Sequence, residues 1–302
     1  MPSLAEPPSV TVVTITKNDP DVSVTVGRVL QELDQYPGSA DLLVVDATPG
    51  TPHRDERPGL RWIPFTSQGH KATIPEQRNL AVAESSGDFV LFIDSGCIPE
   101  PGWLGRMMRP AREDGELIVA GAHTSAERAS IRDQDLDFRH GADYLREAPT
   151  INLAVARTVF ETAGGFDESF GYGSDVDFTW RAVAAGYRIR HEPSAVVSHD
   201  WGSALGDLRR SWVYGQARLR LYLKHAEHRS RIMKDDPIAV IYPVFLLALL
   251  LSRGNRRVLA MAAVPVLKNA RRHPLLTLAH NLAFGAGILA GAARRLNGIA
   301  GA

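Results

Sequence analysis

Short apolar runs alternate with helically spaced apolar positions along the first hundred residues. The runs are uninterrupted and rich in β-branched residues, a pattern typical of strands buried on both faces of a sheet. The predicted strands are residues 10–15 (VTVVTI), 41–46 (DLLVVD), 62–65 (WIPF) and 89–93 (FVLFI). Residues 22–33 and 76–85 have helical spacing and lie between strands. Buried strands joined by helices predict a parallel α/β sheet with helices on both faces.

Polar residues end or directly follow three of these strands. They are Thr16 to Asp19 after the first strand, Asp46 at the end of the second and Asp94 after the fourth. Ligands of parallel α/β sheets bind at the carboxyl ends of the strands, so these residues predict a binding site at one sheet edge. The chain has neither a Gly-x-Gly-x-x-Gly motif after the first strand nor a Gly-Lys-Ser/Thr phosphate loop. Dinucleotide-dependent dehydrogenases and P-loop enzymes therefore have no support.

Composition places the chain among ordinary globular proteins. Its 302 residues include 44% hydrophobic and 23% charged side chains, which excludes disordered, collagenous and disulfide-stapled classes. The single cysteine, Cys97, cannot form an internal disulfide and is expected to be a small buried hydrophobe. Residues 1–9 are Pro-rich and polar without a basic-then-apolar leader, which predicts a flexible start and a cytoplasmic protein.

The formal net charge of zero conceals a basic tail. Residues 1–208 hold 18 basic and 31 acidic side chains, whereas residues 209–302 hold 16 basic and 3 acidic ones. The tail also contains the uncharged runs 237–252, 258–267 and 274–293, of which the first two are short for a membrane span and the third is diluted by small and polar residues. Between the runs lie Arg253, Arg256, Arg257, Lys268, Arg271 and Arg272. Helices lying on an anionic membrane surface have this pattern; a helical subdomain packed on the body and an oligomer interface are the alternatives.

Five segments follow one another in an order that resembles one enzyme family. They are VVTITKND at 12–19, LLVVDATPGT at 42–51, PEQRNLAVAESSGDFVLFIDSGCIPEPGWL at 75–104, the segment from INLAVARTVF to AVVSH at 151–199, and RRSWVYGQARLRLYLKH at 209–225. Together they resemble the family 2 glycosyltransferases, which are inverting enzymes. The resemblance implies the GT-A fold: a nucleotide-binding, Rossmann-like mixed sheet with helices on both faces, here followed by a mainly helical tail.

The resemblance also implies roles for individual residues. Asp175 matches the family's catalytic base, which would remove the proton of an acceptor hydroxyl as its oxygen attacks the anomeric carbon. Asp94 and His199 match ligands of a divalent cation, Mg²⁺ or Mn²⁺, that neutralises the leaving diphosphate. The donor-binding set is Thr14, Thr16, Asn18, Asp46, Arg78, Asp94 and Ser95. The acceptor-side set is Asn152, Ser174 and Trp180.

Several of these residues also have plain structural interpretations. A strand-end acid such as Asp46 often caps a helix or a turn. Arg78 could pair with Glu76 or Asp88 on the surface, and His199 could be a structural histidine. Asp177 competes with Asp175 as the base, and could instead cap or salt-bridge the helix that follows.

Two positions depart from the family pattern. Gly96 stands where the second acid of Asp-x-Asp is usual, so the cation would be held more weakly, or Lys and Arg side chains would neutralise the phosphates without metal. Ser174 replaces the acid that usually precedes the base, so the acceptor preference of the family does not carry over.

The sequence thus predicts a glycosyltransferase domain at residues 10–225 and a membrane-associating or oligomerising helical region at 226–302. The expected partners are a nucleoside-diphosphate-sugar donor, a hydroxyl acceptor on a lipid-linked glycan, polysaccharide or natural product, and the inner face of the cell membrane, with a homodimer as a further alternative and no nucleic acid. A non-catalytic or metal-independent sugar-nucleotide-binding homologue is the competing class. A nucleotidyltransferase is disfavoured, because residues 16–20 (TKNDP) lack the glycine-rich phosphate loop of that class.

Overall fold

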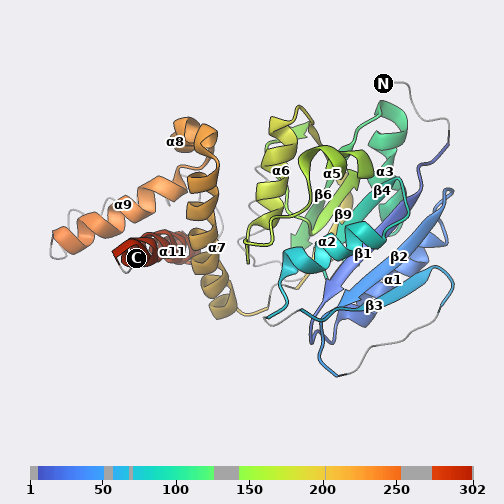
Figure 1. Ribbon diagram of the computed structural model, residues 1–302, viewed down its shortest axis with the longest axis horizontal. Helices are drawn as coiled ribbons and strands as arrows, with labels where there is room; N and C mark the ends of the chain where they lie inside the picture. The colour runs from blue at the N-terminus through green and yellow to red at the C-terminus, as the bar shows by residue number, and fades with distance from the viewer. Residues whose placement is uncertain are drawn as a thin grey trace. The chain divides into compact units, whose positions relative to one another are not determined.

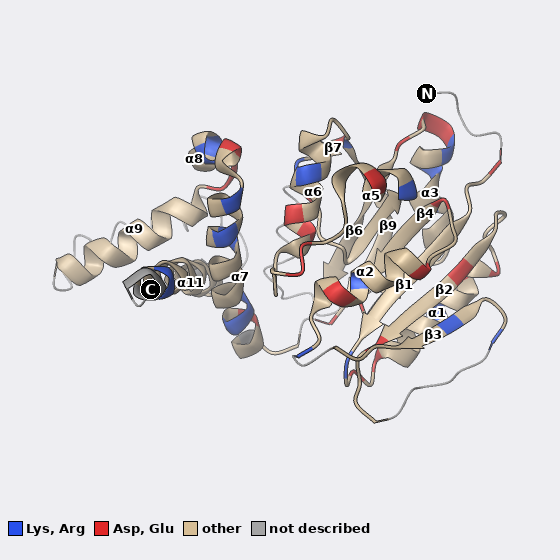
Figure 2. Ribbon diagram, viewed as in Figure 1, with Lys and Arg blue, Asp and Glu red and all other residues tan. Residues whose placement is uncertain are grey.

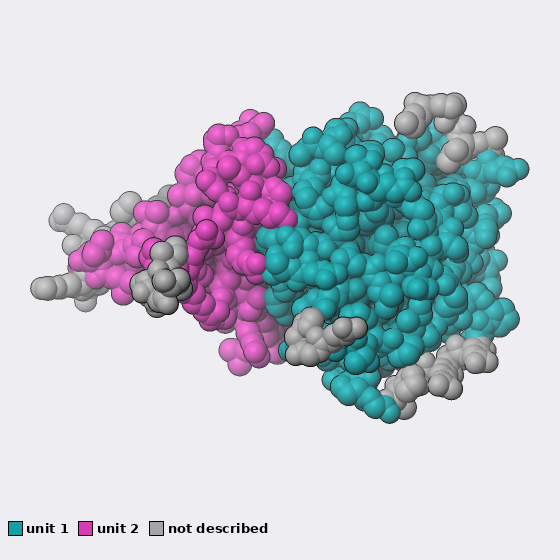
Figure 3. All heavy atoms as spheres, viewed as in Figure 1, with its two compact units in different colours: residues 1–200 teal, residues 201–302 magenta. Residues whose placement is uncertain are grey.

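The computed structural model describes residues 6–50, 57–67, 71–125, 143–200, 202–252 and 274–300 (Figure 1). The chain forms two compact units, residues 1–200 and residues 201–302 (Figure 3). The helix of residues 204–224, which the sequence grouped with the glycosyltransferase domain, belongs to the second unit.

The first unit is built on a nine-stranded mixed sheet with the order β3-β2-β1-β4-β8-β6-β9-β5, and β7 pairs with β9. β1, β2, β3 and β4 are parallel neighbours, as the apolar runs predict, whereas β8 is antiparallel to both β4 and β6. The strands are β1 Val10–Thr16, β2 Ala40–Asp46, β3 Leu60–Pro64, β4 Phe89–Ile93, β5 Cys97–Pro99, β6 Ile118–Ser125, β7 Tyr144–Leu145, β8 Asn152–Ala156 and β9 Ile189–His199.

The helices of the first unit begin at local sequence signals. Thr73 and Glu76 form a reciprocal capping box at the start of α2, and Pro75 occupies the first turn. Gly173, with a φ of 82°, turns the chain into α6. In Figure 1, α2 crosses in front of the sheet, where it contacts β1 and β2. The helices are α1 Val22–Leu33, α2 Ile74–Glu84, α3 Trp103–Asp114, α5 Arg157–Ala163 and α6 Ser174–Ala184.

The end of the predicted leader is held against this unit. The Tyr36 hydroxyl donates to the carbonyl oxygen of Pro8 at 2.8 Å. Ser9 donates through its backbone N–H and its hydroxyl to Oδ2 of Asp88, at 3.0 and 2.6 Å. The ordered part of the unit therefore begins before β1.

The second unit is helical, as expected for the tail. It contains α7 Ala204–Lys224, the 3₁₀ helix η1 Ala226–Arg231, α8 Ile232–Asp235, α9 Ile238–Leu251 and α11 Pro274–Ala300. α11 packs on α7 and on α9. Two of the three apolar runs thus form helices; the run 258–267 and the basic residues between Arg253 and Arg272 lie outside the described residues.

A buried carboxylate anchors the start of α3. Glu32 of α1 accepts the backbone N–H of Gly102 at 2.9 Å and that of Leu104 at 3.0 Å. These are two of the N–H groups that a helix leaves without an internal partner at its first turn. Glu32 thus does for α3 what a capping side chain normally does, from another helix.

We expect Glu32→Ala to lower the free energy of unfolding by about 2–4 kcal/mol, because two inward-facing N–H groups lose their acceptor. Chemical denaturation followed by circular dichroism measures the loss. Glu113→Ala is the matched control, since Glu113 is half-exposed and pairs with its neighbour Arg112, a contact worth about 0–1 kcal/mol. Equal effects of the two substitutions would contradict the capping role.

Candidate active site

The carboxyl ends of three parallel strands meet at one edge of the sheet, as the sequence predicts. Thr16, the last residue of β1, pairs in register with Asp46, the last residue of β2. Asp94 follows the last residue of β4, Ile93, which pairs with Asn152 at the start of β8. Residues from four of the five segments that carry the family resemblance therefore lie at this edge of the sheet.

Asp46 shapes the loops at this edge. It is buried, and its Oδ1 accepts the backbone N–H of Thr48 at 2.8 Å while its Oδ2 accepts the indole N–H of Trp62 at 3.3 Å. The Thr48 hydroxyl in turn accepts the backbone N–H of Asn18 at 2.8 Å, and Asn18 has a left-handed φ of 52°. Asp46 thus has the turn-forming contacts of its structural interpretation, and its role toward a donor stays a prediction.

Three buried hydroxyls at the same strand ends find no hydrogen-bond partner among the described residues. They belong to Thr14, Thr16 and Ser95. With its amide oriented for hydrogen bonding, the buried side chain of Gln77 donates to the backbone carbonyls of Thr16 and Val45, at 3.1 and 3.2 Å. Buried polar groups are nearly always satisfied in native proteins, so a polar ligand at these strand ends is one way in which the three hydroxyls would be satisfied.

Arg78 carries a buried positive charge next to the end of β4. Its side chain is 8% exposed, and its Nη2 lies 3.4 Å from Oδ1 of Asp94, which is 40% exposed. The guanidinium also lies over the ring of Phe166, 5.7 Å from the ring centroid. The surface pairing with Glu76 or Asp88 considered from the sequence is thus replaced by a contact with the strand-end acid.

Asp175, the second residue of α6, belongs to the same electrostatic cluster. Its Oδ1 accepts the backbone N–H of Val176 at 2.9 Å. Burial of the carboxyl group raises the pKa of Asp175, the nearby charge of Arg78 opposes that rise, and the like charge of Asp94 adds to it. A carboxylate with a raised pKa is a stronger base than an ordinary one.

Asp177 has a structural role. Its side chain is completely buried, and its Oδ2 accepts Nε of Arg181 at 2.9 Å. Arg181 also donates to the backbone carbonyls of Ala163 and Gly165. The salt bridge considered for Asp177 is therefore present, and it fixes the turn between α5 and α6.

Asn79 ties the donor-side helix α2 to that same turn, a role that the sequence analysis missed. It donates to the carbonyl of Phe166 at 2.9 Å and to Glu168 at 2.8 Å, and it accepts the backbone N–H of Phe166 at 2.8 Å. A Cβ on Gly165 would lie 2.7 Å from Oδ1 of Asn79, so only glycine leaves room for the contact. The adjacent Arg-Asn pair in the sequence was the available signal.

The three acceptor-side residues are buried and engaged within the protein. Both amide hydrogens of Asn152 are donated, to the carbonyls of Ala122 and Ala195, and its oxygen accepts the indole N–H of Trp103. Trp180 donates to Glu147 at 2.9 Å, and Ser174 begins α6 with 1% of its surface exposed. These contacts position the neighbouring backbone, and direct contact with an acceptor stays a prediction.

Gly96 and His199 lie against each other. Gly96 has a φ of 82°, and a Cβ there would lie 3.3 Å from Cε1 of His199. Cys97 pairs in register with His199 at the end of β9; burial raises the pKa of its thiol, as expected of a buried hydrophobe rather than a nucleophile. Among the residues that the structure describes, no group of three or more His, Cys, Asp or Glu side chains is arranged to hold a metal ion. Protein ligands alone would therefore leave a cation at Asp94 and His199 with few donors.

Parts of the chain are similar to known glycosyltransferases. Residues 57–168 match the family model described as glycosyl transferase family 2. The chain is 30% identical to the pre-mycofactocin glycosyltransferase of Mycobacterium tuberculosis over 192 residues, which are 59% of this chain and 40% of the relative. It is 26% identical over 155 residues to glycosyltransferase AglE of Haloferax volcanii, covering 48% of this chain and 50% of that protein. The chain thus spans half or less of the length of these relatives.

Solved structures share the fold. The mannosyltransferase PcManGT of Pyrobaculum calidifontis, in complex with GDP-Man and Mn²⁺, superposes with a TM-score of 0.69 at 18% identity, covering 97% of this chain and 89% of that one. GalNAc-T7 with UDP, GalNAc and Mn²⁺ superposes with a TM-score of 0.51 at 12% identity, covering 77% and 57%. The predicted GT-A fold is confirmed.

The raised pKa of Asp175 predicts that this residue lowers stability at neutral pH. When the folded state raises the pKa of an acid, ionisation favours unfolding, and the penalty grows as the pH rises from the ordinary Asp value of 3.8 through the folded value. Asp175→Asn should therefore raise Tm at pH 7, by about 2–4 °C for each kcal/mol relieved, with a smaller gain toward pH 4. Thermal melts across this pH range measure the gain. A variant less stable than the parent at pH 7 would contradict the burial of this charge.

Proposed function

We propose that this chain, which has the GT-A fold and matches the glycosyl transferase family 2 model over residues 57–168, transfers a sugar from a nucleoside-diphosphate-sugar to an acceptor hydroxyl, in one displacement with inversion. The observation that carries the proposal is the cluster of Arg78, Asp94 and Asp175. The cluster brings the guanidinium of Arg78, the carboxylate of Asp94 and the carboxyl group of Asp175, whose pKa is raised, to the edge where α/β sheets bind ligands.

In this mechanism Asp175 is the general base. The acceptor oxygen attacks the anomeric carbon of the donor while its proton passes to the Asp175 carboxylate. The bond from that carbon to the diphosphate oxygen breaks, and the electron pair leaves with the nucleoside diphosphate. The Asp175 carboxylate is held in place by its position at the start of α6 and by the hydrogen bond from the backbone N–H of Val176. Its raised pKa gives it a proton affinity closer to that which a general base needs at working pH.

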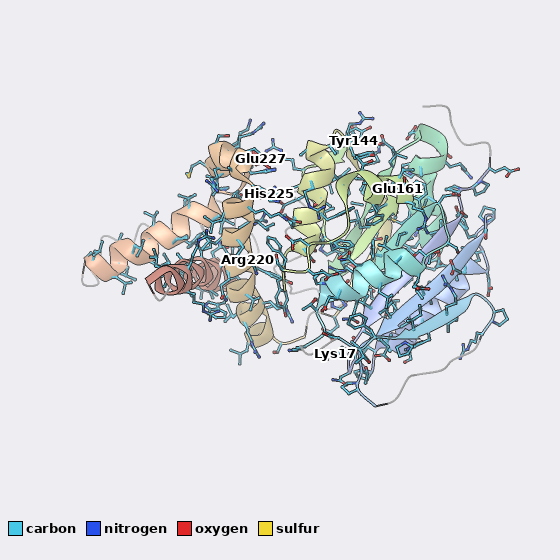
Figure 4. All side chains as sticks on the ribbon, viewed as in Figure 1. Lys17, Tyr144, Glu161, Arg220, His225 and Glu227 are labelled. Carbon is cyan, nitrogen blue, oxygen red and sulfur yellow. The ribbon has the colours of Figure 1, made fainter. Side chains whose placement is uncertain are left out.

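Positive charge is needed where the diphosphate leaves. Arg78 supplies it from a buried position, and Lys17 follows β1 at the same strand edge, labelled at the lower edge of the first unit in Figure 4. A divalent cation fits as a group held jointly by the donor phosphates, Asp94 and His199, since Mg²⁺ commonly takes one or two protein ligands and completes its shell with phosphate oxygens and water. When bound, it would add electrostatic stabilisation of the leaving group.

A second candidate is a non-catalytic or metal-independent sugar-nucleotide-binding homologue. Gly96 and Ser174 favour it, because each replaces an acid that the family pattern contains. The contact of Arg78 with Asp94 supports the metal-independent form, since a guanidinium already neutralises the acid that a cation would use.

Donor, acceptor and location remain parts of the proposal. GDP-Man in PcManGT and UDP in GalNAc-T7 support a nucleoside-diphosphate-sugar donor. The acceptor hydroxyl belongs to a lipid-linked glycan, a polysaccharide or a natural product. The 16 basic and 3 acidic residues of positions 209–302 support a protein attracted to the anionic cytoplasmic face of the cell membrane, with a homodimer through the second unit as the alternative.

We expect one nucleoside diphosphate among UDP, GDP, dTDP and CDP to raise the Tm of the protein. A ligand that binds only the folded state, at a concentration a hundredfold above its Kd, stabilises that state by about 2.7 kcal/mol. Thermal shift with Mg²⁺, Mn²⁺ or EDTA measures this. Loss of the shift in EDTA supports a cation at Asp94 and His199, and a shift that persists in EDTA supports neutralisation by Arg78 and Lys17. No shift with any nucleotide would overturn the donor assignment.

We expect Asp175→Asn to lower turnover by about 10²–10⁴-fold, because the amide cannot accept the proton, while the affinity for the donor diphosphate stays within a few-fold of the parent. Release of the diphosphate in the presence of acceptor, and calorimetric titration with the diphosphate, measure the two quantities. Glu161→Gln is the matched control: Glu161 is an exposed carboxylate on α5, far from Lys17 in Figure 4. Unchanged turnover in Asp175→Asn would remove Asp175 as the base.

A further inference from the structure

Helix α9 is apolar on all sides and yet has one exposed face. Its 14 residues include no charged side chain, and Figure 2 shows α9 without a blue or red segment along its length. Val244, Leu247, Leu250 and Leu251 recur at helical spacing and are exposed, with Leu250 at 73% and Leu251 at 84%. A helix that is hydrophobic all round is normally buried in a protein core or in a membrane.

The other side of α9 is occupied by α11. Tyr242 and Pro243 are buried, and the Tyr242 hydroxyl accepts the side-chain N–H of Asn281 at 3.2 Å. A Cβ on Gly285 would lie 2.8 Å from Cβ of Tyr242, so glycine is what lets the two helices come this close. The exposed leucines therefore form a separate face, which this packing does not cover.

α11 continues the apolar character. Residues 275–296 form one helix that is long and apolar enough to cross a membrane, and Leu275 and Leu296 are among its exposed residues. Its packing on α7 depends on backbone contact: a Cβ on Gly287 would lie 2.0 Å from the carbonyl oxygen of Trp212. Close approach at small residues is how helices associate in an apolar medium, where burial of leucines supplies no driving force.

Basic residues follow α9 in the sequence and occur near the end of α11. Arg253, Arg256 and Arg257 follow α9 in the chain, and Arg294 and Arg295 lie near the end of α11. Lipid headgroups of an anionic bilayer complement such residues, whereas a second copy of this basic unit would repel it. Charge therefore favours lipid over self-association as the occupant.

We infer that the exposed face of α9, defined by Val244, Leu247, Leu250 and Leu251, inserts into the acyl region of an anionic bilayer. At about 1.5 Å per residue α9 is about 21 Å long, too short to cross a hydrocarbon core of about 30 Å. It therefore lies in the interface, and the arginines that follow it in the sequence favour anionic headgroups. This inference goes beyond the proposed function: it adds an apolar, salt-resistant attachment to the electrostatic attraction.

The test uses the full chain and flotation with vesicles of phosphatidylcholine and phosphatidylglycerol at 7:3, in 0.1 and 0.5 M NaCl. We expect the parent to float at both salt concentrations. The double variant Leu247→Glu/Leu250→Glu should lower the vesicle partition coefficient at least about 100-fold, because two carboxylates replace two inserting leucines. Leu205→Glu is the matched control, since Leu205 is 79% exposed but lies at the start of α7; it should float like the parent.

Three results would overturn the inference. The first is a parent that does not float, or that is released by 0.5 M NaCl, which leaves electrostatic attraction alone. The second is a double variant that floats like the parent. The third is a parent dimer that the double variant turns into a monomer without vesicle binding, which assigns the face to self-association. Circular dichroism checks that each variant is folded, and the nucleotide thermal shift on the same samples reports separately on the donor site.

Discussion

The buried guanidinium of Arg78 is the constraint around which the first unit's candidate site is organised. A charge removed from water is costly unless opposite charge and polar contacts surround it. Here Asp94 lies 3.4 Å away, the Phe166 ring lies beneath the guanidinium, and Asp175 lies within its field. Each of these residues comes from a different part of the chain, so the surroundings of Arg78 are complete only once these segments have folded together.

The same region shows how neighbouring acids acquire different roles. Asp175 and Asp177 are both in the first turn of α6. The guanidinium of Arg181 contacts Asp177, which is thereby part of the α5–α6 turn. For Asp175, burial outweighs the opposing charge of Arg78 and the hydrogen bond from the backbone N–H of Val176, so the pKa of its carboxyl group rises. The surroundings of these two acids, two residues apart, thus give Asp177 a structural role and leave Asp175 as the proposed base.

Much of the first unit could be predicted from the sequence, because its strands are buried on both faces and therefore read as uninterrupted apolar runs. β1, β2 and β4 were predicted to within a residue at each end. The antiparallel insertion of β8 could not be predicted, since no local pattern records which strand lies beside β4. Asn79 and Glu32 were missed for a related reason: each side chain satisfies backbone groups that lie tens of residues away.

The glycine that replaces the second acid of Asp-x-Asp, Gly96, suits its local surroundings. The backbone there adopts a left-handed φ of 82°, and the imidazole of His199 lies against the space that a side chain would need. An aspartate at 96 would carry backbone strain of about 1–3 kcal/mol, and its Cβ would require the His199 ring to shift by a few tenths of an ångström. In the same place Arg78 brings positive charge to Asp94. Under the proposed mechanism, Arg78 would supply part of the positive charge that a departing diphosphate needs, with one acid fewer than in the family pattern.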